Sequence, residues 1–150
     1  MKELFVTEIY EQASSLIKSD VFPKSIVNML EHNNVEQTEH KGGSYGELRK
    51  EVEGQGDKYE VHHMPANSAS DLDTNDGPAI VMDKEDHRQT ASCGNSKEAQ
   101  EYREKQKELI EEGKFKEAFQ MDVDDIREKF GDKYDSAIKE AEQYVDTLDK

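Results

Sequence analysis

The chain has 150 residues, of which 37% are charged and 33% are hydrophobic, and its formal net charge is −15 at pH 7. This length suits one domain, or a small core extended by helices whose apolar stripes are pooled. Acidic residues are spread along the whole sequence, which argues against a broad electrostatic surface for nucleic acid. Binding of nucleic acid would therefore depend on a local site, a metal ion or a few Lys and Arg side chains.

Targeting and redox signals are sparse. No apolar run approaches the roughly 20 residues of a membrane span, and the sequence after Met1 has no signal-peptide pattern. If exported, the chain is expected to use a specialised secretion route or to be part of a larger protein. Its single cysteine, Cys93, excludes an intramolecular disulfide and a cysteine-based zinc knuckle, and we expect a small residue in a turn there.

The first 40 residues are predicted to form a helical segment of their own. Apolar residues at helical spacing predict one amphipathic helix over residues 3–18 and a second over 20–30. The stretch that follows is polar and aperiodic and is interpreted as a linker. His32 and His40 lie in it and are expected to be solvated.

Residues 41–150 are predicted to form the main domain. Gly42-Gly43 is interpreted as a break, and Ser44 with Glu47 fits a capping box that opens a short helix. Two β-type runs, 58–64 and 78–82, are separated by a loop rich in Asn, Ser, Asp and Gly, which predicts an antiparallel hairpin.

A short helix is predicted directly after the hairpin. Asp83 is suited to cap it at Lys84, so that His87 lies in its first turn and the helix ends around residues 91–94. The ββα core therefore spans about residues 58–94.

The C-terminal part, residues 95–150, is predicted to be helical throughout. Gly113 and Gly131 are suited to end helices, and Asp122 or Asp124 to begin one. The strongest periodic pattern is that of the last helix. The predicted fold class is α+β and mostly helical, with a small ββα hairpin–helix unit surrounded by amphipathic helices.

Three histidines, His62, His63 and His87, are candidates for a shared site. Adjacent strand residues point to opposite faces, so His62 and His63 converge only if the strand ends or bends, which Pro65 favours. Neutral imidazole is both a common metal ligand and a common general base, and such a set suits metal-assisted hydrolysis of a phosphodiester. The alternative is that these are ordinary strand and helix-start residues.

The motif as a whole resembles a known family. Glu60-Val61-His62-His63, a long loop, a second strand and His87 at a helix start are similar to the ββα-metal (His-Me finger or HNH) nucleases, above all the "xHH" toxin nucleases and the DNase colicins. The longer pattern, over about residues 42–148, resembles toxin domains at the C-termini of bacterial polymorphic toxins. Residues 1–40 fall outside it and are interpreted as a delivery or pre-toxin region.

The resemblance implies a role for each matching residue. His63 matches the general base, His62 and His87 match the metal ligands, and Glu60 matches an acidic residue that helps to position the site. The chain departs from the colicins at Ala91, where they have another histidine, and the metal is left open between magnesium and zinc.

Four further residues are candidate supporting groups: Asp86, Thr90, Ser92 and Arg103. Asp86 is alternatively a favourable charge at a helix N-terminus. Arg103 is interpreted either as a phosphate contact or as half of a surface ion pair.

The function implied by the resemblance is a metal-dependent endonuclease for DNA or RNA. As an antibacterial toxin or effector domain, it would act in the cytoplasm of the target cell and be held by a cognate immunity protein. Two alternatives remain open: a non-enzymatic acidic helical interaction protein (an immunity-like binder or nucleic-acid mimic), and a hydrolase of another phosphodiester. The spatial convergence of His62, His63 and His87 separates the first reading from the non-enzymatic one.

Overall fold

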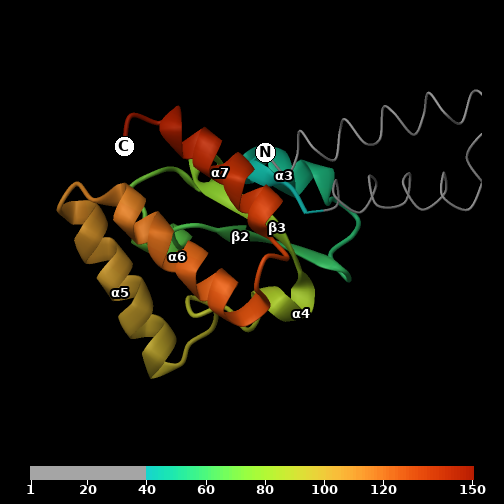
Figure 1. Cartoon of the computed structure of the whole chain (residues 1–150), viewed down its shortest axis with the longest axis horizontal. Helices are drawn as coiled ribbons and strands as arrows, with labels where there is room; N and C mark the ends of the chain where they lie inside the picture. Colours follow the sequence, from blue (N-terminus) through green and yellow to red (C-terminus); the bar gives the residue numbers. More distant parts are fainter. Residues whose placement is uncertain (1–39) are drawn as a thin grey trace, which may run out of the picture. The chain divides into compact units, whose positions relative to one another are not determined.

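The computed structural model describes residues 40–150, which belong to one structural unit. The helices predicted before residue 40, with His32, lie outside the described residues. The unit has the α+β architecture that was predicted, with a three-stranded antiparallel sheet among helices (Figure 1). Its elements are β1 (Gly42–Ser44), α3 (Tyr45–Glu51), β2 (Tyr59–His63), η1 (Asn67–Ala69), η2 (Thr74–Asp76), β3 (Pro78–Asp83), α4 (Lys84–His87), α5 (Lys97–Glu111), α6 (Phe115–Phe130) and α7 (Asp135–Asp146).

The predicted β2–β3 hairpin is confirmed, and its register places the histidines. His62 pairs with Ile80 and His63 with Ala79 in the antiparallel ladder. β3 is the central strand, because β1 pairs with its other edge. The prediction of a mere break at Gly42-Gly43 was therefore wrong: a strand forms there, and a Cβ at Gly42 would lie only 1.9 Å from the carbonyl oxygen of Ala137 in α7.

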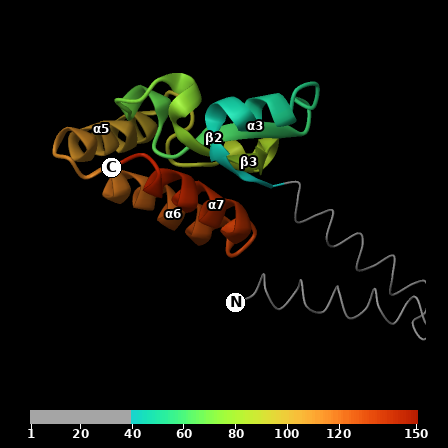
Figure 2. The ribbon, with the colours of Figure 1, turned by 90° about the horizontal axis from the view of Figure 1, so that it is seen from above.

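The two faces of the sheet are covered by different helices. α3 packs on one face, against Ala79 and Val81, while α6 and α7 pack on the other, against Ile80 and Met82 (Figure 2). This division follows from the strand period of two, which sends neighbouring residues of β3 to opposite faces. β3 is buried on both faces, as a central strand of a covered sheet should be.

Several predicted helix ends are confirmed. The Ser44 hydroxyl accepts a hydrogen bond from the backbone N–H of Glu47 at 3.3 Å, which caps α3. Gly131 directly follows α6, and its φ of 62° lies in the left-handed region that glycine adopts at low cost. The periodic pattern of α7 places Ala137, Ile138 and Ala141 in the core.

Two helix predictions were wrong in extent. The helix expected to begin at Asp122 or Asp124 is part of a longer continuous helix, α6, and Asp122 is fully buried in its middle instead of capping an end. α4 stops at His87, before the predicted end at residues 91–94, and the side chain of Asp83 makes no capping bond to it.

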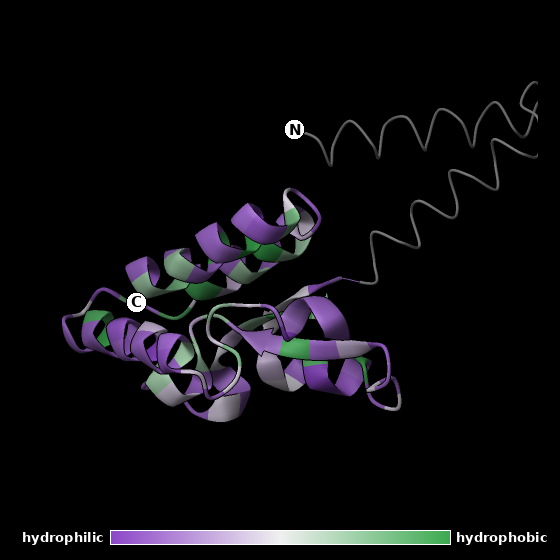
Figure 3. Cartoon of the chain, turned by 90° about the horizontal axis from the view of Figure 1, so that it is seen from below, coloured by the Kyte–Doolittle hydropathy of each residue, from purple (hydrophilic) through white to green (hydrophobic). Residues whose placement is uncertain are grey.

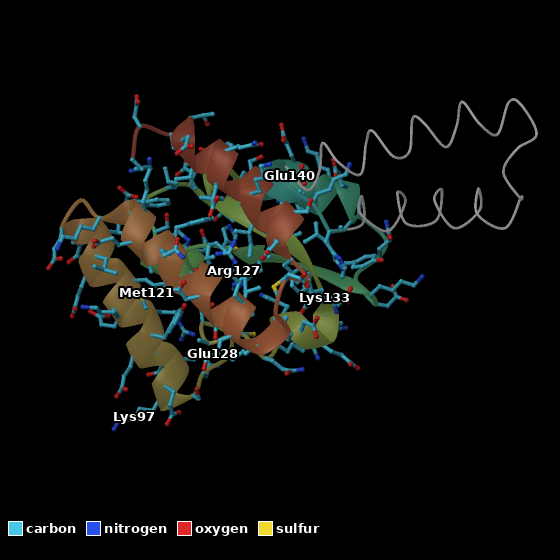
Figure 4. The ribbon with its side chains drawn as sticks, in the orientation of Figure 1. Lys97, Met121, Arg127, Glu128, Lys133 and Glu140 are labelled. Atoms are coloured by element: carbon cyan, nitrogen blue, oxygen red, sulfur yellow. The ribbon has the colours of Figure 1, made fainter. Side chains whose placement is uncertain are left out.

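Asp83 instead joins a polar cluster that includes His40. Nε2 of His40 lies 2.9 Å from Oδ1 of Asp83, and the His40 ring contacts the ring of Tyr134 at 5.0 Å. The prediction that His40 is solvated was therefore wrong, because the aromatic and acidic partners come from distant parts of the chain. Lys133, in the loop between α6 and α7 (Figure 4), binds both Asp83 and Asp86 at 2.7 Å.

The exterior of the unit is polar. Hydrophilic residues cover much of the helical ribbon, with hydrophobic positions in between (Figure 3). Among residues 40–150 no helix combines the length and the apolar character that crossing a membrane would need.

Candidate functional site

His62, His63 and His87 line one pocket with a volume of about 430 Å³. The rings of His62 and His87 are in edge contact, with centroids 5.0 Å apart. The three histidines that sequence analysis grouped therefore line the same pocket, and two of them, His62 and His87, are in direct contact. The full lining comprises Tyr45, Val61, His62, His63, Ala66, Asn67, Ser68, His87, Ser92, Cys93, Gly94, Asn95 and Arg103.

His62 is the most deeply buried member of the site. Its side chain is 2% exposed, and its Nε2 atom has no hydrogen-bond partner in the described chain. Burial, with smaller contributions from His87 and His63, holds the pKa of His62 well below its ordinary value. The ring is therefore neutral at pH 7, and a buried ring nitrogen without a partner is a polar group that costs stability unless something binds it.

His87 is oriented by Glu60 from the neighbouring strand. Its Nδ1 atom lies 3.0 Å from Oε1 of Glu60, and Arg88 lies 3.6 Å from the same oxygen. Partial burial raises the pKa of Glu60, but the hydrogen bond from His87 and the charges of His87, Arg88 and Lys84 outweigh it, so the net pKa is lowered. The carboxylate accepts the Nδ1 proton of His87, which leaves Nε2 as the ring atom with a free lone pair.

His63 points to the face of the sheet opposite to that of its neighbour His62, and the loop after β2 holds it. Its Nε2 donates a hydrogen bond to the carbonyl oxygen of Thr74 at 2.9 Å, and its ring stacks on Tyr45 at 4.0 Å between centroids. Because Nε2 carries the proton, Nδ1 is the basic atom. Desolvation, opposed in part by the bond to Thr74, lowers the pKa of His63, so the ring is available to accept a proton near neutral pH.

Gly77 makes room for this arrangement. A Cβ atom there would lie 2.9 Å from Cδ2 of His63. The carbonyl oxygen of Gly77 accepts a hydrogen bond from the backbone N–H of Tyr45 at 2.9 Å, which ties the start of α3 to the same loop. His63 is thus packed between an aromatic ring and a side-chain-free backbone.

The donor set suits an open metal site with two histidine ligands. The described residues contain no group of three or more His, Cys, Asp or Glu side chains arranged to hold an ion. They do contain Nε2 of His62, a buried nitrogen without a partner. Beside it lies His87, whose Nδ1 is bound by the carboxylate of Glu60. The Glu60–His87 bond is the arrangement by which outer carboxylates orient metal-binding histidines. An ion held by these two histidines would need water or substrate oxygens as its other ligands.

The four supporting residues proposed from sequence are placed differently. Ser92 and Arg103 line the pocket, whereas Asp86 and Thr90 do not. Asp86 accepts hydrogen bonds from Lys133 and the hydroxyl of Tyr134, both at 2.7 Å. The hydroxyl of Thr90 donates to the carbonyl oxygen of His87 at 2.7 Å and so closes the end of α4.

Arg103 is neither half of a surface ion pair nor a free side chain. Its Nη1 donates to the carbonyl oxygens of Ser92 and Gly94, both at 2.7 Å, and in the described residues it pairs with no carboxylate. Its positive charge therefore faces the pocket without being neutralised by an ion pair.

Sequence analysis did not find the remaining pocket residues. Cys93, for which we expect a turn position, lies in the pocket wall, and Tyr45 is not among the predicted site residues. The sequence pattern assigns Asn67 and Ser68 to a polar loop and Asn95 to the start of the helical C-terminal part. Their place in the pocket depends on how the loops after β2 and α4 are positioned in the fold, which no local sequence pattern predicts.

Comparison with protein-family models, curated proteins and solved structures found no match to this chain. The chemistry of the site therefore rests on the geometry of its own side chains.

Proposed function

We propose that this chain is a metal-dependent endonuclease that hydrolyses phosphodiester bonds in the pocket lined by the three histidines. One observation carries the proposal: Nε2 of His62 is buried without a partner beside His87, whose Nδ1 is bound by Glu60. Natural proteins rarely bury a polar atom without a partner, and a bound ion is one of the standard reasons.

The polarity of the pocket supports an anionic substrate. The chain has 35 Asp and Glu residues, yet no Asp or Glu of the described residues 40–150 is among those that line the pocket. The lining instead includes Arg103 and the three histidines. A phosphate can therefore approach this site without a carboxylate in the pocket wall, although the protein as a whole is strongly acidic.

The residues would share the work as follows. Nδ1 of His63 takes a proton from a water molecule, and the water oxygen attacks the phosphorus as the bond to the leaving oxygen breaks; that oxygen then takes a proton from solvent. His62 and His87 would hold a divalent cation, magnesium or zinc, and Glu60 would keep His87 in the binding tautomer. The cation would stabilise the developing negative charge.

The biological role that we infer follows the family resemblance of the histidine motif. The domain would be an antibacterial toxin or effector that degrades DNA or RNA in the cytoplasm of a target cell. A cognate immunity protein would protect the producing cell. Delivery would use a specialised secretion route or a larger parent protein.

A second candidate is hydrolysis of a small phosphodiester. The volume of the pocket, about 430 Å³, lies in the range typical of small-ligand sites. The same histidines would act in the same roles, and only the substrate would differ. A third reading, a non-enzymatic acidic interaction protein, draws on the net charge of −15 and predicts no hydrolysis of any substrate.

The test is a cleavage assay with the purified full chain. Plasmid DNA, RNA and bis(p-nitrophenyl) phosphate are incubated with added Mg²⁺ or Zn²⁺, and with EDTA. We expect cleavage of nucleic acid that EDTA stops and that His63→Ala abolishes, while His40→Gln, outside the pocket, retains it. Cleavage of the small diester alone would favour the second candidate. Equal cleavage by wild type and His63→Ala would refute the base assignment.

A further inference from the structure

Two loops each contribute a wall of the pocket, and side chains of helix α5 bind both of them. Ala66, Asn67 and Ser68 belong to the loop after β2, and residues 92–95 belong to the loop after α4. The first loop contacts α5, and the second leads into it. The first loop contains only the short 3-10 helices η1 and η2, and the second contains no helix or strand, so the position of each depends in part on the side chains that bind its backbone.

Arg103 and Gln106 bind those two backbones. Nη1 of Arg103 donates to the carbonyl oxygens of Ser92 and Gly94, on either side of Cys93. Oε1 of Gln106 accepts the backbone N–H of Ala66 at 3.2 Å. Residues three apart on an α-helix share a face, so these two side chains reach the two walls from the same side of α5.

Gln106 is itself held from α6. It is completely buried, and its Nε2 donates to the carbonyl oxygen of Ala118 at 3.1 Å and to Oδ2 of Asp122 at 2.8 Å. Asp122 also accepts the hydroxyl of Tyr102 at 2.9 Å. Both polar atoms of the buried Gln106 side chain are hydrogen-bonded, so it forms a specific link between the loop after β2 and α6.

We propose that α5 is a clamp that sets the opening of the pocket, with Arg103 and Gln106 as positioning residues. Arg103 fixes the wall that contains Cys93, and Gln106 fixes the wall that contains Ala66. The proposal extends the proposed function, because these are the walls of the proposed active site. The clamp itself can be tested without any assay of cleavage.

The first arm of the test uses the only thiol of the chain. Cys93 lies in the wall that Arg103 holds, so its reaction with a disulfide reagent such as DTNB reports the opening of that wall. We expect Arg103→Ala to speed labelling by about tenfold or more, because two charge-assisted bonds are lost. Arg103→Lys should restore slow labelling in part, because an ammonium group can still donate to a carbonyl.

The second arm follows the other wall. We expect Gln106→Asn, which keeps the amide but is one methylene shorter, to speed hydrogen exchange at the Ala66 amide by about tenfold or more. Lys105→Ala is the matched control for both arms, since it removes one positive charge from the exposed face of α5. It should change neither rate.

Acceleration in both arms, with the control unchanged, supports the clamp. Wild-type rates in either arm overturn it. If Gln106→Asn fails to fold, the Arg103 arm decides alone, because Arg103 is only partly buried. A clamp that behaves as expected in a chain without nuclease activity would refute the proposed function and leave this inference standing.

Discussion

Nδ1 of His87 lies 3.0 Å from Oε1 of Glu60, and this contact joins the first turn of α4 to strand β2. The bond determines which ring nitrogen of His87 carries the proton and therefore which one can bind a metal. It also ties together two residues that are 27 positions apart in the sequence.

Removing the Glu60 carboxylate should weaken metal binding. We expect Glu60→Ala to lower the affinity for a divalent ion by roughly 10- to 100-fold, because His87 loses the group that fixes its tautomer and orientation. Glu60→Gln should lose less, since its amide oxygen still accepts the Nδ1 proton. The measurement is the rise in melting temperature on adding metal to the EDTA-treated chain. The control is Glu85→Ala, which removes an acidic side chain from α4, the helix that carries His87, at a position outside the pocket lining. This variant should bind metal as the wild type does.

Replacing His62 by leucine should stabilise the chain when no metal is present. The unpaired Nε2 of His62 is buried, and a buried polar atom without a partner costs about 1–3 kcal/mol. We expect His62→Leu to raise the free energy of unfolding in EDTA by about that amount and to abolish stabilisation by metal. Urea denaturation with and without metal measures both effects. A variant that is less stable in EDTA, or that still gains stability from metal, would contradict this account of His62.

A single methyl group at residue 77 should displace the base. A Cβ there would lie 2.9 Å from Cδ2 of His63, so the ring must shift. We expect Gly77→Ala to lower the cleavage rate by roughly 10- to 100-fold, because misplacing a catalytic group by a fraction of an ångström to 1 Å has such effects. Metal binding should be unchanged. At Gly56 a Cβ would meet no atom within 4 Å, so Gly56→Ala is the control. Comparable activity in the two variants would argue against a role for His63 as base.

Much of the fold could be predicted because the patterns are local. The two β-type runs with the polar loop between them, the Ser44 cap and the apolar spacing of the last helix each depend on residues that are close in sequence. The grouping of His62, His63 and His87 was also within reach, since a hairpin followed by a helix start brings those positions together.

The rest depends on long-range packing. Gln106 looked like one more polar residue of an exposed helix, but the backbone of Ala66 and the carboxyl of Asp122 make its site polar and buried. Asp122 has the residue type of a helix cap, but its hydrogen bonds to Gln106 and Tyr102 come from another helix and place it in the core. His40 seemed to belong to a linker, although Asp83 and Tyr134 bind it from more than 40 residues away. A single sequence does not carry these pairings in its local pattern.

Asp122 should make stability depend on pH. Burial raises the pKa of its carboxyl to about 7, against the hydrogen bonds from Gln106 and Tyr102, whereas the ordinary value is 3.8. Between about pH 4 and pH 7 the unfolded chain has lost this proton and the folded chain still holds it. Stability therefore falls as pH rises through this window, by up to about 1.4 kcal/mol per pH unit, and the effect of this group levels off above it.

The variant Asp122→Asn removes that titration. We expect the difference in free energy of unfolding between wild type and Asp122→Asn to shift against wild type as pH rises from about 4 to 7, and to stay constant above. Urea denaturation at several pH values measures it. Because both proteins carry the same other carboxyl groups, the pH dependence due to those groups cancels in the difference. A difference that does not change across the window would mean that Asp122 ionises normally.

The central claim is that His62 and His87 hold a divalent ion while His63 serves as the base. The most direct measurement is calorimetric titration of Zn²⁺, and of Mn²⁺ as a stand-in for Mg²⁺, into the EDTA-stripped full chain and its histidine variants. We predict one site per chain that is lost in His62→Leu and in His87→Ala and retained in His63→Ala. Binding that survives both of the first two changes, or that disappears only with His63, would contradict it.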